Sequence, residues 1–141
     1  MRERAKSGGT RHRILIVDDE ESTRLLLARI VAHDLKAEVQ LAGTCEQALK
    51  LAGSFAYDAI LLDLLMPGIG GYEVLKRVRA GSANTQTPIV VVSVLEDQET
   101  VDKTLAVGAS AYLLKPIERR TLVATIKAQM AARTHPGHPR G

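Results

Sequence analysis

The chain has 141 residues, the usual size of one domain, so two independent hydrophobic cores are not expected. Hydrophobic residues make up 45% and charged residues 25%, as in ordinary soluble globular proteins, which excludes disorder throughout. Aromatic residues are only 3%, which disfavours a single-stranded nucleic-acid surface built from stacked rings. The apolar runs are too short to span a membrane and no secretory signal opens the chain, so the sequence predicts a cytoplasmic protein with no membrane partner.

The net charge of +3 comes from the two ends of the chain. Residues 1–13 carry five basic side chains and one acidic side chain, and Arg133 and Arg140 add two positive charges at the other end. Between them, residues 14–132 hold 12 basic and 15 acidic side chains. A folded surface that reads nucleic acid is therefore unexpected, although a basic arm could touch phosphates weakly. The composition predicts a mobile basic tail at 1–12, one domain at 13–132 and a mobile tail at 133–141.

Cys45 is the one cysteine, which excludes a disulfide within the chain and a cysteine-based zinc site, as expected in a reducing compartment. It is predicted to be a small hydrophobic side chain on a helix. His135 and His138 lie in the Pro/Gly-rich C-terminal tail and are predicted to be solvated rather than metal ligands.

Five short apolar runs alternate with segments of helical spacing. The runs are Ile14–Val17, Glu38–Ala42, Ala59–Leu62, Pro88–Val92 and Ala111–Leu114. Nearly continuous apolar strands separated by helices are typical of a parallel sheet covered on both faces. Because such crossovers are right-handed, the sequence predicts an α/β, flavodoxin-like, doubly wound fold with five parallel strands in the order 2-1-3-4-5 and helices on both faces.

The intervening segments each have apolar residues predicted to face the core. These residues are Leu26 and Ile30, Leu49 and Ala52, Leu75 and Val78, Val101 and Leu105, and, behind Glu118 in the last segment, the row Leu122, Ile126 and Met130. Glycines also predict where three helices end. Gly53, Gly81 and Gly108 are expected at the ends of the second, third and fourth helices.

Four of the five predicted strands end at polar residues. Asp18 and Asp19 follow the first strand, Asp63 the third, Ser93 the fourth and Lys115 the fifth. The carboxyl ends of parallel strands share one edge of the sheet, where ligands of doubly wound folds bind. Three neighbouring carboxylates repel one another, and their oxygen atoms favour Mg²⁺, or Mn²⁺, as the compensating ion. An ion, an ammonium and a hydroxyl around a carboxylate would stabilise a transferring phosphoryl group.

These strand ends resemble the receiver domain of bacterial two-component response regulators, of the chemotaxis-regulator type. The matching stretches are ILIVDDE at 14–20, LLDLLMPGIGG at 61–71, VVVSV at 90–94 and AYLLKP at 111–116, within about residues 13–132. Four motifs in this order and at these spacings are highly specific. The resemblance implies a phosphorylation-dependent signalling domain rather than an enzyme with a separate substrate, one that assists only its own phosphorylation and dephosphorylation.

The resemblance also assigns the phosphorylation site. It implies that Asp63 accepts a phosphoryl group from a sensor histidine kinase, a phosphotransfer protein or a small donor such as acetyl phosphate. Asp19 matches the direct Mg²⁺ ligand and Asp18 the acid that holds the ion through water. The backbone carbonyl of Leu65 completes the implied protein ligands. Asp63 is expected to be the acid closest to both the ion and Lys115.

A second set of matching residues implies a switch. Ser93 matches the hydroxyl that moves to the phosphoryl oxygen, Lys115 the phosphoryl-binding lysine, and Tyr112 the ring that turns inward. Pro116 matches a proline usually preceded by a cis bond. The fourth helix, fifth strand and fifth helix would then change surface and bind a downstream protein, a missing effector domain or a second copy of the chain.

The sequence departs from the family pattern at several positions. Val94 stands where a small residue is common, which predicts a more crowded phosphoryl site. Gly70 stands where an acidic or hydroxyl N-cap is common. Leu65 and Leu95 flank the path of the attacking water and therefore bear on the lifetime of the phosphorylated state.

Two alternatives stay open on the sequence alone. The chain could be a receiver fragment of a longer regulator or hybrid kinase whose effector domain is absent. It could also be an aspartyl-phosphate hydrolase, but such enzymes place the second acid two residues after the nucleophile, whereas Asp18 and Asp19 are adjacent. No phosphate-binding glycine motif follows the first strand, which argues against a nucleotide-binding fold.

Overall fold

The structure is a computed structural model that describes residues 11–133. The tail residues 1–10 and 134–141, with His135 and His138, lie outside the described residues, so the predictions made for them are not addressed. Strands and helices alternate as predicted. The strands are β1 (Arg13–Val17), β2 (Glu38–Ala42), β3 (Ala59–Leu62), β4 (Ile89–Ser93) and β5 (Ala111–Leu114). The helices are α1 (Glu21–Asp34), α2 (Cys45–Ser54), α3 (Gly71–Gly81), α4 (Gln98–Val107) and α5 (Arg119–Arg133).

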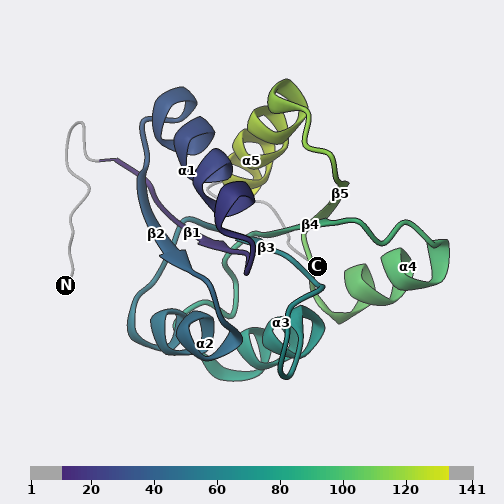
Figure 1. The fold of residues 1–141 in the computed structure, drawn as a ribbon. Coiled ribbons are helices and arrows are strands. Elements are labelled where there is room, and N and C mark those ends of the chain that lie inside the picture. The colour runs from purple at the N-terminus through teal and green to yellow at the C-terminus, as the bar shows by residue number, and fades with distance from the viewer. Residues whose placement is uncertain (1–10, 134–141) are drawn as a thin grey trace.

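The strands form one parallel sheet in the order β2-β1-β3-β4-β5, which confirms the predicted topology. In Figure 1, α1 and α5 lie on one face of this sheet, and α2, α3 and α4 lie on the other. β1 starts one residue earlier than predicted, and β4 is displaced by one residue so that it includes Ser93.

The core consists of two layers, one on each side of the sheet. Successive strand residues point to opposite faces, so Leu15 packs with the α2 and α3 layer while Ile14 and Ile16 pack with the α1 and α5 layer. The predicted row of α5 is confirmed, because Leu122, Ile126 and Met130 are all buried. Burying each such side chain contributes about 1.5–3 kcal/mol, so α5 is anchored along its length.

Two predicted core positions are wrong. Leu26 is 47% exposed, and Leu27 occupies the core position on α1 instead. Leu105 is 40% exposed, and the neighbouring Thr104 is the buried residue of α4. Each residue of a helix is rotated by about 100° from the one before it, so packing against the sheet decides which of two adjacent residues is buried. Ile30 fits both rows of α1, which is why the sequence did not distinguish them.

The glycine signals for the ends of the second, third and fourth helices are confirmed. Gly108 directly follows α4 with a φ of 136°, a backbone conformation that favours glycine. Gly81 is the last residue of α3, and Gly53 is the last but one of α2. The end of α3 is capped by Ser82, whose hydroxyl donates to the carbonyl of Val78 at 3.0 Å.

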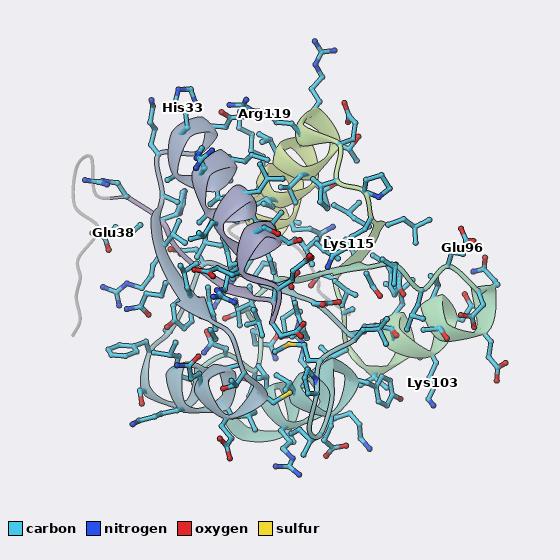
Figure 2. The ribbon with its side chains drawn as sticks, viewed as in Figure 1. His33, Glu38, Glu96, Lys103, Lys115 and Arg119 are labelled. Atoms are coloured by element: carbon cyan, nitrogen blue, oxygen red, sulfur yellow. The ribbon has the colours of Figure 1, made fainter. Side chains whose placement is uncertain are left out.

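An ion pair joins the two helices on one face of the sheet. Arg119 at the start of α5 donates to both carboxylate oxygens of Asp34 at the end of α1, with distances of 2.8 and 2.6 Å. Figure 2 shows Arg119 and His33 side by side at these helix ends. The hydrogen bond from Arg119 lowers the pKa of Asp34, and the neighbouring His33 lowers it further.

Candidate functional site

Three carboxylates meet at the carboxyl edge of the sheet, between its two central strands. Asp18, Asp19 and Asp63 each offer an oxygen, and these oxygens lie within 4.8 Å of one another. Asp18 is 1% exposed and Asp63 is 5% exposed, whereas Asp19 is exposed. The structure therefore brings together the three acids that the sequence placed at the ends of two strands.

The backbone ladder of the sheet sets the position of two of these acids. The amide of Asp18 donates to the carbonyl of Ala42 at 3.1 Å, and the amide of Asp63 donates to the carbonyl of Val17 at 3.0 Å. Each aspartate thus continues its strand by one residue before the chain turns. The two side chains are held at the sheet edge because their main chains remain paired with neighbouring strands.

Each buried carboxylate also accepts a backbone hydrogen bond from its own loop. Asp18 Oδ1 accepts from the amide of Glu20 at 2.9 Å, and Asp63 Oδ1 accepts from the amide of Leu65 at 3.2 Å. Leu65 therefore lies beside Asp63, and the role of its carbonyl as a ligand stays a prediction.

Lys115 supplies the positive charge, but it lies nearer to Asp18 than expected. Its Nζ is 2.9 Å from Asp18 Oδ2 and 3.6 Å from Asp63 Oδ2, so the expectation that Asp63 is the acid closest to Lys115 is wrong. The ammonium donates a hydrogen bond to the more deeply buried of the two carboxylates, whose charge has the least access to water. The predicted cis bond between Lys115 and Pro116 is present.

Burial and charge act in opposite directions on the groups of this site. Burial raises the pKa of Asp63, the charge of Lys115 lowers it, and the charge of Asp18 raises it again, with a net increase. Burial by itself lowers the pKa of Lys115, but the hydrogen bond to Asp18 and the charge of Asp63 raise it above its ordinary value. One ammonium thus faces three acids, which leaves the site with excess negative charge.

The donor set fits Mg²⁺. All three acids supply carboxylate oxygens, the hard ligands that this ion prefers, and the exposed side of Asp19 leaves access for water molecules, several of which Mg²⁺ usually retains. An ion here would compensate the charge that Lys115 leaves unbalanced.

Ser93 and Tyr112 meet at the backbone of Leu95. Ser93 is buried at the end of β4, and its Oγ accepts from the Leu95 amide at 3.1 Å. The Tyr112 hydroxyl donates to the Leu95 carbonyl at 2.7 Å, and burial raises the pKa of this tyrosine. One residue of the loop that leads to α4 thus connects the two predicted switch side chains.

The positions that depart from the family pattern lie around the same edge. Val94 is 55% exposed, so its side chain forms part of the surface beside the site. Gly70 is the N-cap of α3, and its φ of 87° lies in the region that favours glycine. Because glycine has no side chain, no side-chain hydrogen bond caps this helix.

Sequence reasoning missed Arg24 of α1. Its Nη1 donates to the backbone carbonyl of Asp18 at 2.8 Å, and its guanidinium lies so close to Gly43 that a Cβ there would be 3.0 Å from Nη1. Arg24 thus fixes the loop that carries Asp18 against the loop before α2. In the sequence it looks like any charge on an exposed helix face, and only its contacts distinguish it.

Comparison with known proteins identifies the family. Residues 14–127 match the model of the response regulator receiver domain. The chain belongs to this family. It is 37% identical over 123 residues to the response regulator ArlR of Staphylococcus saprophyticus, a match that covers 84% of this chain and 52% of that protein. The chain spans about half the length of several curated relatives that it matches.

Two solved structures illustrate the similarity. The CheY-like receiver domain protein of Methanospirillum hungatei superposes with a TM-score of 0.82 and 26% identity, covering 90% of this chain and 99% of that one. The receiver domain of the sensor histidine kinase PA1611 of Pseudomonas aeruginosa has a TM-score of 0.78 and 26% identity over 86% of this chain and 98% of its own. That structure has a magnesium ion coordinated in its active-site cleft.

The receiver domain is a signalling module, so the predicted function class and the flavodoxin-like fold are both confirmed. Within residues 11–133, no helix is long and apolar enough to cross a membrane.

Proposed function

We propose that Asp63 is the phospho-acceptor of this receiver domain and takes its phosphoryl group from a phosphohistidine of a sensor kinase or phosphotransfer protein. The observation that carries the proposal is the position of its nearly buried carboxylate, which lies within the acid cluster and 3.6 Å from the Lys115 ammonium. Asp18, Asp19, Asp63 and the Leu65 carbonyl would hold Mg²⁺, or Mn²⁺ in its place.

The hydrogen bonds favour Asp63 over its neighbours as the nucleophile. Both oxygens of Asp18 are engaged, one by the Glu20 amide and the other by Lys115 at 2.9 Å. Asp63 has one oxygen bonded to the Leu65 amide, while the other faces Lys115 at the longer distance of 3.6 Å. The carboxylate of Asp63 is therefore the buried one with an oxygen free to form a new bond.

In the proposed step, an oxygen of Asp63 bonds to phosphorus as the phosphorus–nitrogen bond of phosphohistidine breaks. The electron pair of that bond goes to the imidazole, which takes up a proton from water. With acetyl phosphate, a phosphorus–oxygen bond breaks and acetate leaves. A bound Mg²⁺ would neutralise the phosphoryl oxygens during this transfer. Lys115, 3.6 Å from Asp63, contributes a second positive charge, so the chain would assist its own phosphorylation.

Phosphorylation would act on the output surface through Leu95. The new phosphoryl oxygens attract the Ser93 hydroxyl, and this movement breaks its bond to the Leu95 amide. The Leu95 carbonyl is held by Tyr112, so the ring and the loop respond together. α4 begins after Asp97, two residues further along, so the change reaches the surface of α4, β5 and α5.

The charges on that surface suit a second copy of the chain. The exposed acids Glu96, Asp97, Glu99 and Asp102 lie in and just before α4, whereas the exposed bases Arg120 and Lys127 lie on α5. Opposite charges on the two helices would pair between copies in a symmetric homodimer. A downstream protein or an effector domain from a longer form of this regulator would compete for the same surface.

The unit that carries this function is proposed to be residues 13–132, acting in the cytoplasm. His12 also joins the sheet, since its carbonyl accepts from the Glu38 amide at 2.8 Å. The relatives of twice this length support an effector domain in a longer protein.

The phosphorylation proposal is tested by intact-mass analysis after incubation with acetyl phosphate and Mg²⁺. We expect one added phosphoryl group on the wild type and none on Asp63→Asn. Asp102→Asn, an exposed aspartate of α4, is the matched control and should behave as wild type. Because Val94 is predicted to crowd the site, phosphoramidate serves as a second donor. Equal modification of wild type and Asp63→Asn with either donor would refute the assignment.

A further inference from the structure

Gly71, the first residue of α3, lies directly against the backbone of the acceptor. A Cβ built on Gly71 would be 2.0 Å from the carbonyl oxygen of Asp63, 2.7 Å from Cα of Leu64 and 2.9 Å from the carbonyl carbon of Asp63. All three atoms belong to the main chain, so no side-chain rotation can make room. Gly71 is required here for space, because its own backbone lies outside the left-handed region that favours glycine.

The same residue also closes the loop that follows the acceptor. The amide of Gly71 donates to the carbonyl of Leu64 at 2.9 Å, so the loop from Leu65 to Gly70 leaves and returns beside Asp63. On the opposite side, the amide of Asp63 donates to Val17 of β1 at 3.0 Å. The acceptor backbone is therefore held between β1 and the first turn of α3.

Neither α3 nor the backbone of Asp63 can move easily. α3 is fixed to the sheet by Val74, Leu75 and Val78, all of which are buried. Asp63 is fixed by the ladder between β1 and β3. A methyl group at position 71 would need about an ångström or more of extra separation from the Asp63 carbonyl, since real Cβ atoms essentially never come within 3.0 Å of such an atom. The displacement must therefore fall on α3, on residues 63–64, or on both.

We propose that Gly71 is a positioning residue that sets the backbone of Asp63 and thereby the approach of its carboxylate to the phosphoryl donor. The proposal rests on the assignment of Asp63 as the phospho-acceptor. A misplacement of about 1 Å at a reacting group lowers rates by on the order of 10²-fold. Gly71→Ala should thus reduce the rate of transfer at saturating donor and Mg²⁺, while a merely less stable protein would lose activity only in proportion to its unfolded fraction.

The test measures the rate of phosphorylation by acetyl phosphate at saturating Mg²⁺, with the folded fraction determined by circular dichroism. We expect Gly71→Ala to be about 10²-fold slower per folded molecule. Gly81→Ala is the control for replacing a glycine of the same helix, because nothing lies within 4 Å of its Cβ position. Val74→Ala is the control for destabilising α3 without adding an atom against Asp63, and both controls should stay within threefold of wild type.

Amide chemical shifts provide the second readout. In ¹⁵N-labelled protein, Gly71→Ala should shift the amides of Asp63, Leu64 and Leu65, and Gly81→Ala should leave them unchanged. If Gly71→Ala folds poorly, trimethylamine N-oxide restores the folded state for both measurements. Phosphorylation of Gly71→Ala within threefold of wild type, or an equal loss in Val74→Ala, would overturn the inference. If the wild type itself is not phosphorylated, the assignment of Asp63 fails, while the amide shifts still decide whether Gly71 positions its backbone.

Discussion

Asp63→Asn should stabilise the domain in the absence of divalent ions, because it removes a carboxylate that the fold buries with too little compensation. At an effective dielectric constant of about 20, attraction to Lys115 at 3.6 Å amounts to about 5 kcal/mol. Repulsion from Asp18 within 4.8 Å opposes it by about 3–4 kcal/mol. The exposed Asp19 adds roughly 1 kcal/mol of screened repulsion. These charge terms nearly cancel.

The cost of dehydrating the Asp63 carboxylate therefore decides the sign. This cost is several kcal/mol for a buried ion and is partly offset by the hydrogen bond from the Leu65 amide. We expect a net gain of about 2 kcal/mol in the free energy of unfolding for Asp63→Asn at pH 7. For a domain of this size, that gain corresponds to a rise of about 8 °C in Tm.

The gain should depend on pH in a defined direction. Burial raises the pKa of Asp63 above 3.8, the ordinary value that this carboxyl group has in the unfolded chain. The folded protein therefore holds the proton of this carboxyl group more tightly than the unfolded chain does. The wild type consequently loses stability as the pH rises from that value through the raised pKa of the folded state. Asp63→Asn has no such loss. The difference between the two proteins should be smallest at the acidic end of this window and constant above it.

Urea unfolding followed by circular dichroism between pH 4 and 8, in the presence of a chelator, measures this difference. Asp102→Asn, which removes an exposed aspartate, is the control and should change stability little. Mg²⁺ at ten times its dissociation constant should stabilise the wild type by about 1.4 kcal/mol. The difference in free energy of unfolding between Asp63→Asn and the wild type should then become smaller. A variant less stable than the wild type at pH 7 without ions, or a gap that does not change with pH, would refute this reasoning.

Three further results are expected. Calorimetry should show that the wild type binds Mg²⁺ with a dissociation constant in about the millimolar range. Asp19→Ala should abolish this binding more completely than Asp18→Ala. The reverse order would mean that the direct and water-mediated ligands are exchanged. Arg24→Gln should weaken the same binding severalfold because the loop before α1 loses its anchor, and an unchanged affinity would exclude this role. With a beryllofluoride mimic, amide exchange should change mainly in Ser93–Arg120, and Ser93→Ala should still accept phosphate yet respond less. A change in amide exchange in Ser93→Ala equal to that of the wild type would show that the Ser93 hydroxyl takes no part in the coupling.

The sequence by itself determined the order of elements, the sheet topology and the set of residues at its active edge. Runs such as Ala59–Leu62 are apolar without interruption, so they predict buried parallel strands, and right-handed crossovers then leave few possible topologies. Polar residues directly after those runs had to share one edge of the sheet. This is why Asp18, Asp63 and Lys115 could be grouped although the chain separates them by up to 97 positions.

Only the tertiary structure decided how these elements turn and which atoms touch. The rotation of α1 buries Leu27 in place of Leu26, because packing on the sheet selects between two rows that share Ile30. The ammonium of Lys115 lies 2.9 Å from Asp18 and 3.6 Å from Asp63, a difference within one cluster that strand ends alone do not predict. The main-chain contact of Gly71 with Asp63 has no signal in hydrophobic pattern or charge. Such contacts depend on separations of an ångström or less between segments that fold together, whereas a linear pattern records only residue type and spacing.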